Sequence, residues 1–119
     1  MLLTEGTTQQ LDCLTQVQPI RDALDVISGK WKVLIISSIM QGNRRFSEIE
    51  TSIPKLNPKV LAKELKDLEE HQLIRRLVHE DDYPVRIEYV ATDYARTLKT
   101  VMLALHDWGV GHRKRIMGQ

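Results

Sequence analysis

The stretch from residue 55 to residue 70, KLNPKVLAKELKDLEE, predicts a helix with two different faces. Asn57 is a favourable N-cap and Pro58 suits the first helical position, so we expect the helix to span residues 58–71. If Leu61, Leu65 and Leu68 form its inner stripe, a rotation of about 100° per residue places lysines near the opposite side. These lysines are Lys59, Lys63 and Lys66.

The charges along this helix run against the helix dipole. The lysines crowd toward its N-terminal half, whereas Asp67, Glu69 and Glu70 occupy its C-terminal half. A helix dipole favours acidic residues first and basic residues last. A solvated outer face is the ordinary explanation of such lysines. A recognition helix has a reason to carry them, because its N-terminal residues meet phosphates and base edges of DNA.

The composition of the whole chain indicates one globular domain. The chain has 119 residues, a formal net charge of +1, 42% hydrophobic residues and 28% charged residues. It contains no run of 18 apolar residues, its N-terminus lacks the pattern of a secretion signal, and its single cysteine excludes an internal disulfide framework. We therefore expect a cytoplasmic protein that makes no membrane contact and whose electrostatic surface comes from local clustering.

Periodicity predicts the remaining elements. Pro19 and Gly29 bracket a first helix, residues 30–40 form a buried central helix, and residues 44–53 form a short third helix. After the lysine-bearing helix, residues 73–79 and 85–90 are compatible with strands joined by a loop, and a last helix begins near Thr92 and reaches Trp108 or beyond. The predicted fold class is mainly α with a small β-hairpin: a winged helix-turn-helix with an added C-terminal dimerisation helix.

The predicted DNA contacts come from three parts of this fold. Lysine near a helix N-terminus can contact phosphate or guanine, two arginines before the short helix can hold the backbone, and the hairpin can reach an adjacent phosphate or minor groove. The acidic loop at residues 80–82 argues against a hairpin tip buried deep in DNA. Asn57 can act as an N-cap alone, and the two arginines can be ordinary surface residues. The candidate residues are Asn57, Lys59, Lys63, Lys66, Arg44, Arg45, Arg86 and His79.

The last helix carries an apolar seam that is typical of paired helices. Its members are spaced 4, 3, 4 and 3 residues apart, and Met102 widens the seam. The alternative is that the seam packs wholly within one chain. We expect a homodimer, because two recognition helices on a two-fold axis read an inverted repeat. The predicted interface is Tyr94, Leu98, Val101, Met102, Leu105 and Trp108.

Three stretches of the sequence resemble one family. The segments ALDVISGKWKVLIISSIMQGNRRFSEIETSIPKLNPKVLAKELKDLEEHQLIRR, YPVRIEYVATDYARTL and LHDWG, within about residues 18–110, are similar to the HxlR-type winged helix-turn-helix regulators of bacteria and archaea. The resemblance implies a dimeric, DNA-binding transcription factor. It also implies that the helix after Asn57 enters the major groove and that the hairpin at residues 77–87 is the wing.

One departure from that family concerns a thiol. Many members carry Cys-Pro at the start of the first helix, and in some of them this cysteine senses oxidants or electrophiles. The matching dipeptide here is Gln18-Pro19, and Cys13 lies five residues earlier. A small apolar filler is the plain interpretation of Cys13, and a displaced redox-active thiol is the alternative.

The sequence divides into an N-terminal arm at residues 1–18, a DNA-binding domain at 19–92, and a C-terminal dimerisation helix with a basic tail at 93–119, all within one structural domain. We find no catalytic constellation, no metal-ligand spacing among the histidines and no cofactor motif, so the sequence does not indicate an enzyme. Two alternatives remain at this point. One is a winged-helix module that binds proteins and not DNA, and the other is a regulator controlled by a small molecule at its dimer interface.

Overall fold

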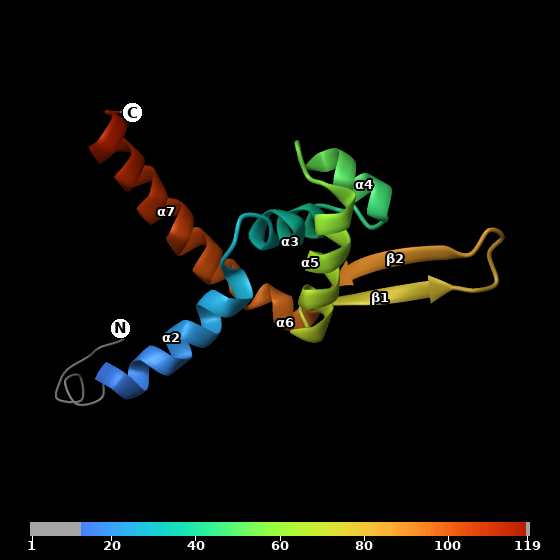
Figure 1. Cartoon of the computed structure of the whole chain (residues 1–119), viewed down its shortest axis with the longest axis horizontal. Helices are drawn as coiled ribbons and strands as arrows, with labels where there is room; N and C mark the ends of the chain where they lie inside the picture. Colours follow the sequence, from blue (N-terminus) through green and yellow to red (C-terminus); the bar gives the residue numbers. More distant parts are fainter. Residues whose placement is uncertain (1–12, 119) are drawn as a thin grey trace.

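The computed structural model describes residues 13–118, with side chains from Val17 onward. The elements follow the order α2 (Cys13–Ile27), α3 (Lys32–Met40), α4 (Phe46–Ser52), α5 (Pro58–Glu70), β1 (Ile74–His79), β2 (Arg86–Ala91), α6 (Asp93–Arg96) and α7 (Leu98–Met117). Three helices, α3, α4 and α5, gather at the base of a two-stranded hairpin (Figure 1). The predicted fold class is confirmed.

The core is built from the inward faces of these short elements. Ile35, Ile36 and Ile39 of α3 are buried against Ile49 of α4. The inner stripe of α5 is also buried as predicted, with Leu61, Leu65 and Leu68 all in the same cluster. Fully burying a leucine or isoleucine side chain contributes about 1.5–3 kcal/mol. This cluster therefore holds α5 at a fixed angle to α3 and α4.

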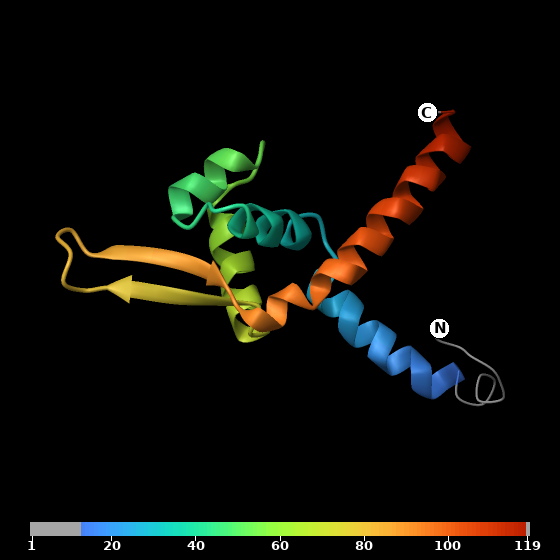
Figure 2. The ribbon, with the colours of Figure 1, turned by 180° about the vertical axis from the view of Figure 1, so that it is seen from behind.

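The hairpin is antiparallel and extends away from the helices. Its register pairs Ile74 with Ala91 at the base and His79 with Arg86 toward the tip. Ile74 is buried in the core. The N–H of Tyr89 donates a hydrogen bond of 2.8 Å to the carbonyl oxygen of Arg44, which ties β2 to the segment before α4. Both views of the ribbon show the hairpin projecting on the side opposite α2 and α7 (Figures 1 and 2).

The expected helix start at Pro19 is wrong. Helix α2 begins at Cys13 and contains Pro19 in its interior, so it runs through the expected boundary between residues 18 and 19. Proline lacks an N–H and suits a first helical turn, which made Pro19 a plausible start. Gly29 has φ +95°, in the left-handed region that favours glycine, and it lies in the turn after the helix as expected.

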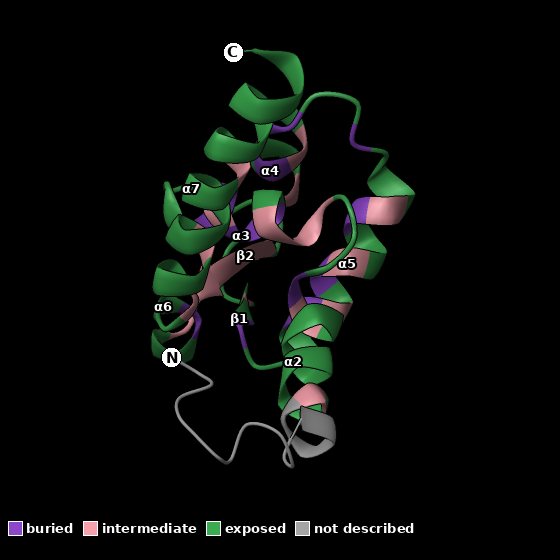
Figure 3. Ribbon diagram, turned by 90° about the vertical axis from the view of Figure 1, so that its left-hand side faces the viewer, coloured by how far each residue is buried: buried purple, intermediate pink, exposed green. Residues whose placement is uncertain are grey.

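The predicted last helix is divided in two. Thr92 caps α6, because its Oγ1 accepts the N–H of Ala95 at 3.1 Å and donates to the carbonyl oxygen of Gln72 at 2.7 Å. The chain then passes through Thr97 into α7, whose twenty residues include no buried one. Figure 3 shows α7 as almost wholly exposed. Helix α6 contributes the buried Ala95 to the core, and Leu98 at the start of α7 packs against the same cluster.

Helices α2 and α7 extend the molecule beyond the size of a compact domain. The radius of gyration is 17.6 Å, and the principal extents are 60, 35 and 22 Å. A compact chain of this length has a radius of gyration of about 13.5 Å. The two helices diverge from the same side of the helical core (Figure 2). They leave large apolar side chains in contact with solvent.

Candidate nucleic-acid interface

The N-terminus of α5 is fixed by Asn57. The side-chain oxygen of Asn57 accepts the N–H of Lys59 at 2.7 Å and that of Val60 at 3.4 Å. Such a cap contributes about 1 kcal/mol. The cap uses only the side-chain oxygen of Asn57, so the N–H groups of its side-chain amide remain available to donate to DNA. Its predicted DNA contact stays a prediction.

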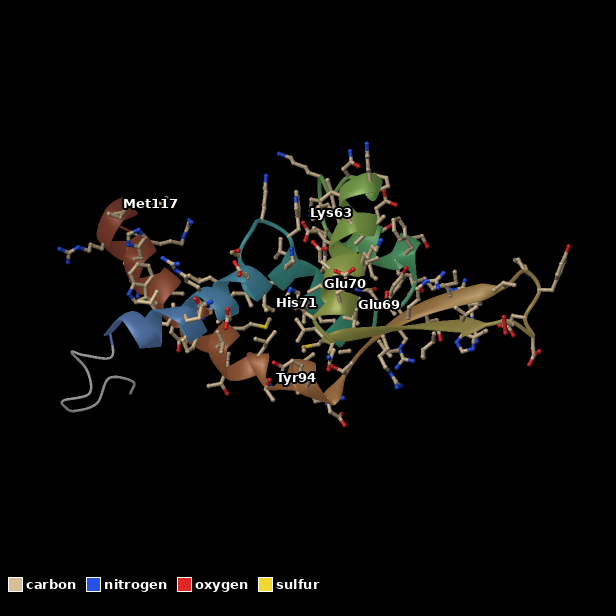
Figure 4. All side chains as sticks on the ribbon, turned by 60° about the horizontal axis from the view of Figure 1, so that its bottom comes forward. Lys63, Glu69, Glu70, His71, Tyr94 and Met117 are labelled. Carbon is tan, nitrogen blue, oxygen red and sulfur yellow. The ribbon has the colours of Figure 1, made fainter. Side chains whose placement is uncertain are left out.

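The three lysines of α5 point to solvent, on the side away from the buried leucines. Lys63 is 70% exposed and contacts Asp67 at 3.2 Å, one helical turn further along. A surface pair of this kind contributes only about 0.3–0.5 kcal/mol, so a phosphate can replace the aspartate. Lys59 and Lys66 make no ion pair within residues 17–118. Figure 4 shows Lys63 on the upper side of the molecule, with Tyr94 of α6 on the lower side.

A partly buried lysine from α3 holds α5 in position. The side chain of Lys32 is 12% exposed, and its Nζ lies 2.5 Å from Glu64 and 3.5 Å from Asp67 of α5. The hydrogen bond to Glu64 raises the pKa of Lys32, against an opposing effect of burial. The hydrogen bond from Lys63 lowers the pKa of Asp67, with a further contribution from Lys32. Glu64 and Asp67 therefore anchor α5 to α3 through Lys32, while the three lysines of α5 stay exposed to an outside partner.

Lys32→Met will lower the free energy of unfolding by about 1–3 kcal/mol at neutral pH, because Glu64 loses its charged partner inside a half-buried site. Because the pKa of Asp67 is lowered in the folded state, its stabilisation is complete above the ordinary carboxylate range and is lost as pH falls below it. The wild type will lose stability on acidification, and Lys32→Met will lose less. Urea unfolding between pH 3 and pH 7 measures both effects. Equal pH slopes for the two proteins would contradict this assignment.

Arg44 and Arg45 lie exposed just before α4. Glu48 accepts hydrogen bonds from both of their backbone N–H groups, at 3.0 and 3.1 Å. These two hydrogen bonds lower the pKa of the Glu48 carboxyl, and the bond from Arg45 has the larger effect. The backbone at this helix start is therefore fixed, while the two guanidinium groups remain on the surface. Their predicted role as a clamp on the DNA backbone stays a prediction.

The two predicted contacts of the hairpin both lie beside acids. Arg86 Nε is 3.2 Å from Asp82 Oδ2, and His79 Nε2 is 2.9 Å from Glu88 Oε1. Asp82 belongs to the acidic loop, so part of the hairpin's positive charge is compensated within the protein. This pairing favours a weaker contribution to DNA binding from the wing, the hairpin at residues 77–87, than from α5.

Arg86→Ala will weaken DNA binding by less than about tenfold and leave the preferred sequence unchanged, as expected for a contact to the DNA backbone. Selection of binding sites from a random DNA pool, with the wild type and the variant in parallel, measures preference and affinity together. An altered preference at a single base pair would show that Arg86 reads a base.

The predicted dimer residues fall into two groups. Leu98 packs against the core and Met102 is half-buried. The other four are exposed, with Leu105 at 50% and Trp108 at 70%, and the ring of Trp108 stacks on His112. The exposed members are Tyr94, Val101, Leu105 and Trp108. The alternative in which the whole seam packs within one chain does not describe this structure.

Further exposed residues are visible only in the structure. Arg75 and Arg76 are exposed on β1, pointing to opposite faces of the hairpin. Ile20 and Leu24 of α2 are each about half exposed, so α2 shares the apolar character of α7. A strand that alternates apolar and polar residues would have indicated which residues face solvent. Two adjacent arginines interrupt this alternation in β1, so the sequence did not predict that both are exposed.

Residues 17–118 contain no group of three or more metal-ligating side chains. Within the described helices, none is long and apolar enough to cross a membrane. The side chain of Cys13 lies outside the described side chains, so its possible redox role stays a prediction.

The three short helices α3, α4 and α5 are followed by a hairpin wing, and α5, the second helix of the helix-turn-helix, has an exposed basic face. These features define a winged helix-turn-helix protein of the kind found among transcriptional regulators. The chain belongs to the HxlR-like helix-turn-helix family, which it matches over residues 26–117. The HTH-type transcriptional regulator YdeP of Bacillus subtilis is 36% identical over 98 residues, covering 82% of this chain and 76% of YdeP.

Solved structures agree with this placement. The redox regulator HypR in its reduced form has a TM-score of 0.75 and 31% identity, covering 85% of this chain and 99% of HypR. The reduced form of the transcriptional regulator YodB from B. subtilis has a TM-score of 0.72 and 29% identity, covering 85% of this chain and 95% of YodB.

Proposed function

We propose that this protein is a transcriptional regulator that binds double-stranded DNA sequence-specifically as a homodimer. The observation that carries the proposal is the division of α5 into a buried leucine stripe and an exposed lysine face. Lys59 and Lys63 lie in the N-terminal half of the second helix of a helix-turn-helix, the part that contacts base edges and phosphates in the major groove, and Lys66 follows on the same face. We assign the contacts to Lys59, Lys63 and Lys66, with Asn57, Arg44 and Arg45 beside them.

The homodimer is supported by the unpartnered faces of α2 and α7. Helix α7 presents Val101, Leu105 and Trp108 along one side, and α2 presents Ile20 and Leu24. Contiguous exposed apolar surface of this kind marks an interaction site. A second copy that packs on these faces generates a two-fold axis. Two α5 helices then address an inverted repeat whose half-sites are about 34 Å apart.

We divide the chain into three functional parts. We propose that residues 1–18, whose last six belong to α2, contribute to the dimer, that 19–92 bind DNA, and that 93–119 provide the dimerisation helix with its basic tail. The basic residues 112–115 lie near the C-terminal end of α7, where the helix dipole favours positive charge, and they need not touch DNA. Such a regulator works where the chromosome lies, so the cytoplasm is the compartment we propose.

A gel shift with the DNA upstream of the protein's own gene, in the presence of excess unrelated DNA, tests this function. The proposal expects a specific complex that contains two protein chains. A protein that binds no operator fragment, and finds none in selection from a random DNA pool, would instead favour a winged-helix module that binds other proteins.

Cys13→Ser will leave the response of DNA binding to oxidants and electrophiles unchanged, because Gln18 occupies the position at which many family members carry the sensing thiol. The measurement compares operator binding by the wild type and the variant before and after treatment with peroxide and with a quinone. Release of DNA by the treated wild type, but not by the treated variant, would make Cys13 the sensor and overturn this expectation.

A further inference from the structure

A cavity of about 750 Å³ lies where the DNA-binding part meets α6 and α7. Its lining includes apolar side chains from three elements. Ile39 comes from α3, Val90 from β2, and Met102 and Leu103 from α7. Pockets for small organic molecules commonly enclose about 300–1,000 Å³ and combine an apolar lining with a few polar groups. The size and lining of this cavity match that pattern.

The polar lining of this cavity is rich in positive charge. Arg44, Arg96, Lys99 and His106 line it, and no aspartate or glutamate does. Two of these side chains have acidic neighbours outside the lining: Arg96 is 3.6 Å from Asp93, and His106 is 3.1 Å from Asp107. Both of these contacts are exposed. Lys99 and the guanidinium of Arg44 form no ion pair within residues 17–118. In a protein with a net charge of +1, the gathering of Arg44, Arg96 and Lys99 around one cavity favours an anion there.

We propose that this cavity binds a small organic anion, with an aromatic or apolar body and a carboxylate, as an effector that weakens DNA binding. The apolar body lies against Ile39, Val90 and Met102, and the carboxylate faces Arg96 and Lys99. A charged carboxylate gains most from such partners because charge-assisted hydrogen bonds are about twice as strong as neutral ones. The binding half of the proposal stands on the cavity alone, and the effector half rests on the proposed function.

Two features connect the cavity to DNA binding. Arg44 lines the cavity and also belongs to the predicted clamp on the DNA backbone, so a ligand held at Arg96 and Lys99 lies in the same cavity as a residue that is predicted to contact phosphate. The cavity also lies between α7 on one side and α3 and β2 on the other. The angle between α7 and the DNA-binding part sets the separation of the two α5 helices in the proposed dimer. A ligand that prefers one angle shifts the population toward it. On α7, Lys99, Leu103 and His106 lie on the side of the helix opposite the seam of Val101, Leu105 and Trp108.

Isothermal titration calorimetry of the full chain without DNA tests the binding half. The probes are benzoate, 1-naphthoate and indole-3-acetate, with the neutral 1-naphthamide for comparison. We expect at least one carboxylate to bind saturably, and 1-naphthoate to bind about tenfold or more tightly than 1-naphthamide. Arg96→Gln combined with Lys99→Gln will weaken carboxylate binding by a similar factor. Arg113→Gln with Lys114→Gln, which removes the same charge elsewhere on α7, will not.

The binding half is overturned if none of the three carboxylates binds saturably, if acid and amide bind equally, or if both double variants behave alike. The effector half is tested by operator binding at saturating carboxylate. We expect weaker operator binding by the wild type and no change for the Arg96→Gln, Lys99→Gln variant. A carboxylate that binds yet leaves operator affinity unchanged overturns the effector role. Absence of operator binding without any carboxylate would refute the proposed function, and calorimetry would still judge the cavity.

Discussion

Val101→Asp combined with Leu105→Asp will convert the protein into a monomer and weaken binding to an inverted-repeat operator by roughly 10²–10⁴-fold, because two linked half-sites no longer act together. Both side chains are exposed on α7, which has no buried residue. The charged variant therefore keeps the core of α3, α4 and α5. Leu98 is unsuitable for this test, because it packs against that core.

Sedimentation and circular dichroism measure the assembly and the fold of this variant. A matched control, Thr100→Asp with Gly111→Asp, adds the same two charges to exposed positions on other sides of α7. We expect the control to remain dimeric. A wild type that is monomeric but binds a palindromic operator tightly would refute the interface, and so would a Val101→Asp, Leu105→Asp protein that stays dimeric.

Replacing Lys59, Lys63 and Lys66 together with alanine will remove most of the DNA affinity. A hydrogen bond that involves a charged group contributes about 1.5–3 kcal/mol, which corresponds to roughly tenfold or more for each lysine in contact with DNA. Each lysine that neutralises a phosphate also contributes about 0.9 to the slope of log affinity against log salt concentration. The slope will therefore fall by up to about 2.7 for each subunit.

The control for this variant is alanine at Arg113, Lys114 and Arg115, which removes the same charge from the far end of α7. Fluorescence anisotropy with an operator fragment at several salt concentrations gives both the affinity and the slope. If the α5 variant is folded and matches the wild type in both affinity and salt slope, Lys59, Lys63 and Lys66 do not contact DNA. If the two triple variants weaken binding equally, net charge alone explains the effect.

The features that were predictable from sequence are those set by near neighbours along the chain. The leucine stripe of α5, its cap at Asn57 and the cap of α6 at Thr92 each depend on residues within one or two helical turns. Local periodicity and capping chemistry therefore identified them. The exposure of the lysine face follows from the same periodicity, because burying one side of a helix leaves the other in solvent.

The features that sequence could not supply depend on contacts between distant segments. Lys32 meets Glu64 across 32 positions, and no local pattern pairs them. The cavity brings Arg44 together with Lys99 and His106, which come from elements at opposite ends of the fold. The first helix was wrongly predicted to start at Pro19 because proline is common at helix starts, whereas α2 continues through this residue. The pairing of Arg86 with Asp82 required the course of the hairpin loop.

In the proposed complex, α5 lies in the major groove, once in each half of an inverted repeat. Ala62 is exposed on α5 near the lysine face, so Ala62→Cys in a Cys13→Ser background offers an attachment point that keeps every lysine. With iron–EDTA attached there, we expect DNA cleavage in two patches about one helical turn apart, symmetric about the operator centre. The same reagent attached through Lys114→Cys will not cleave at those positions. Cleavage absent from the Ala62→Cys protein while it is bound to the operator, or equal in the two proteins, would contradict the account.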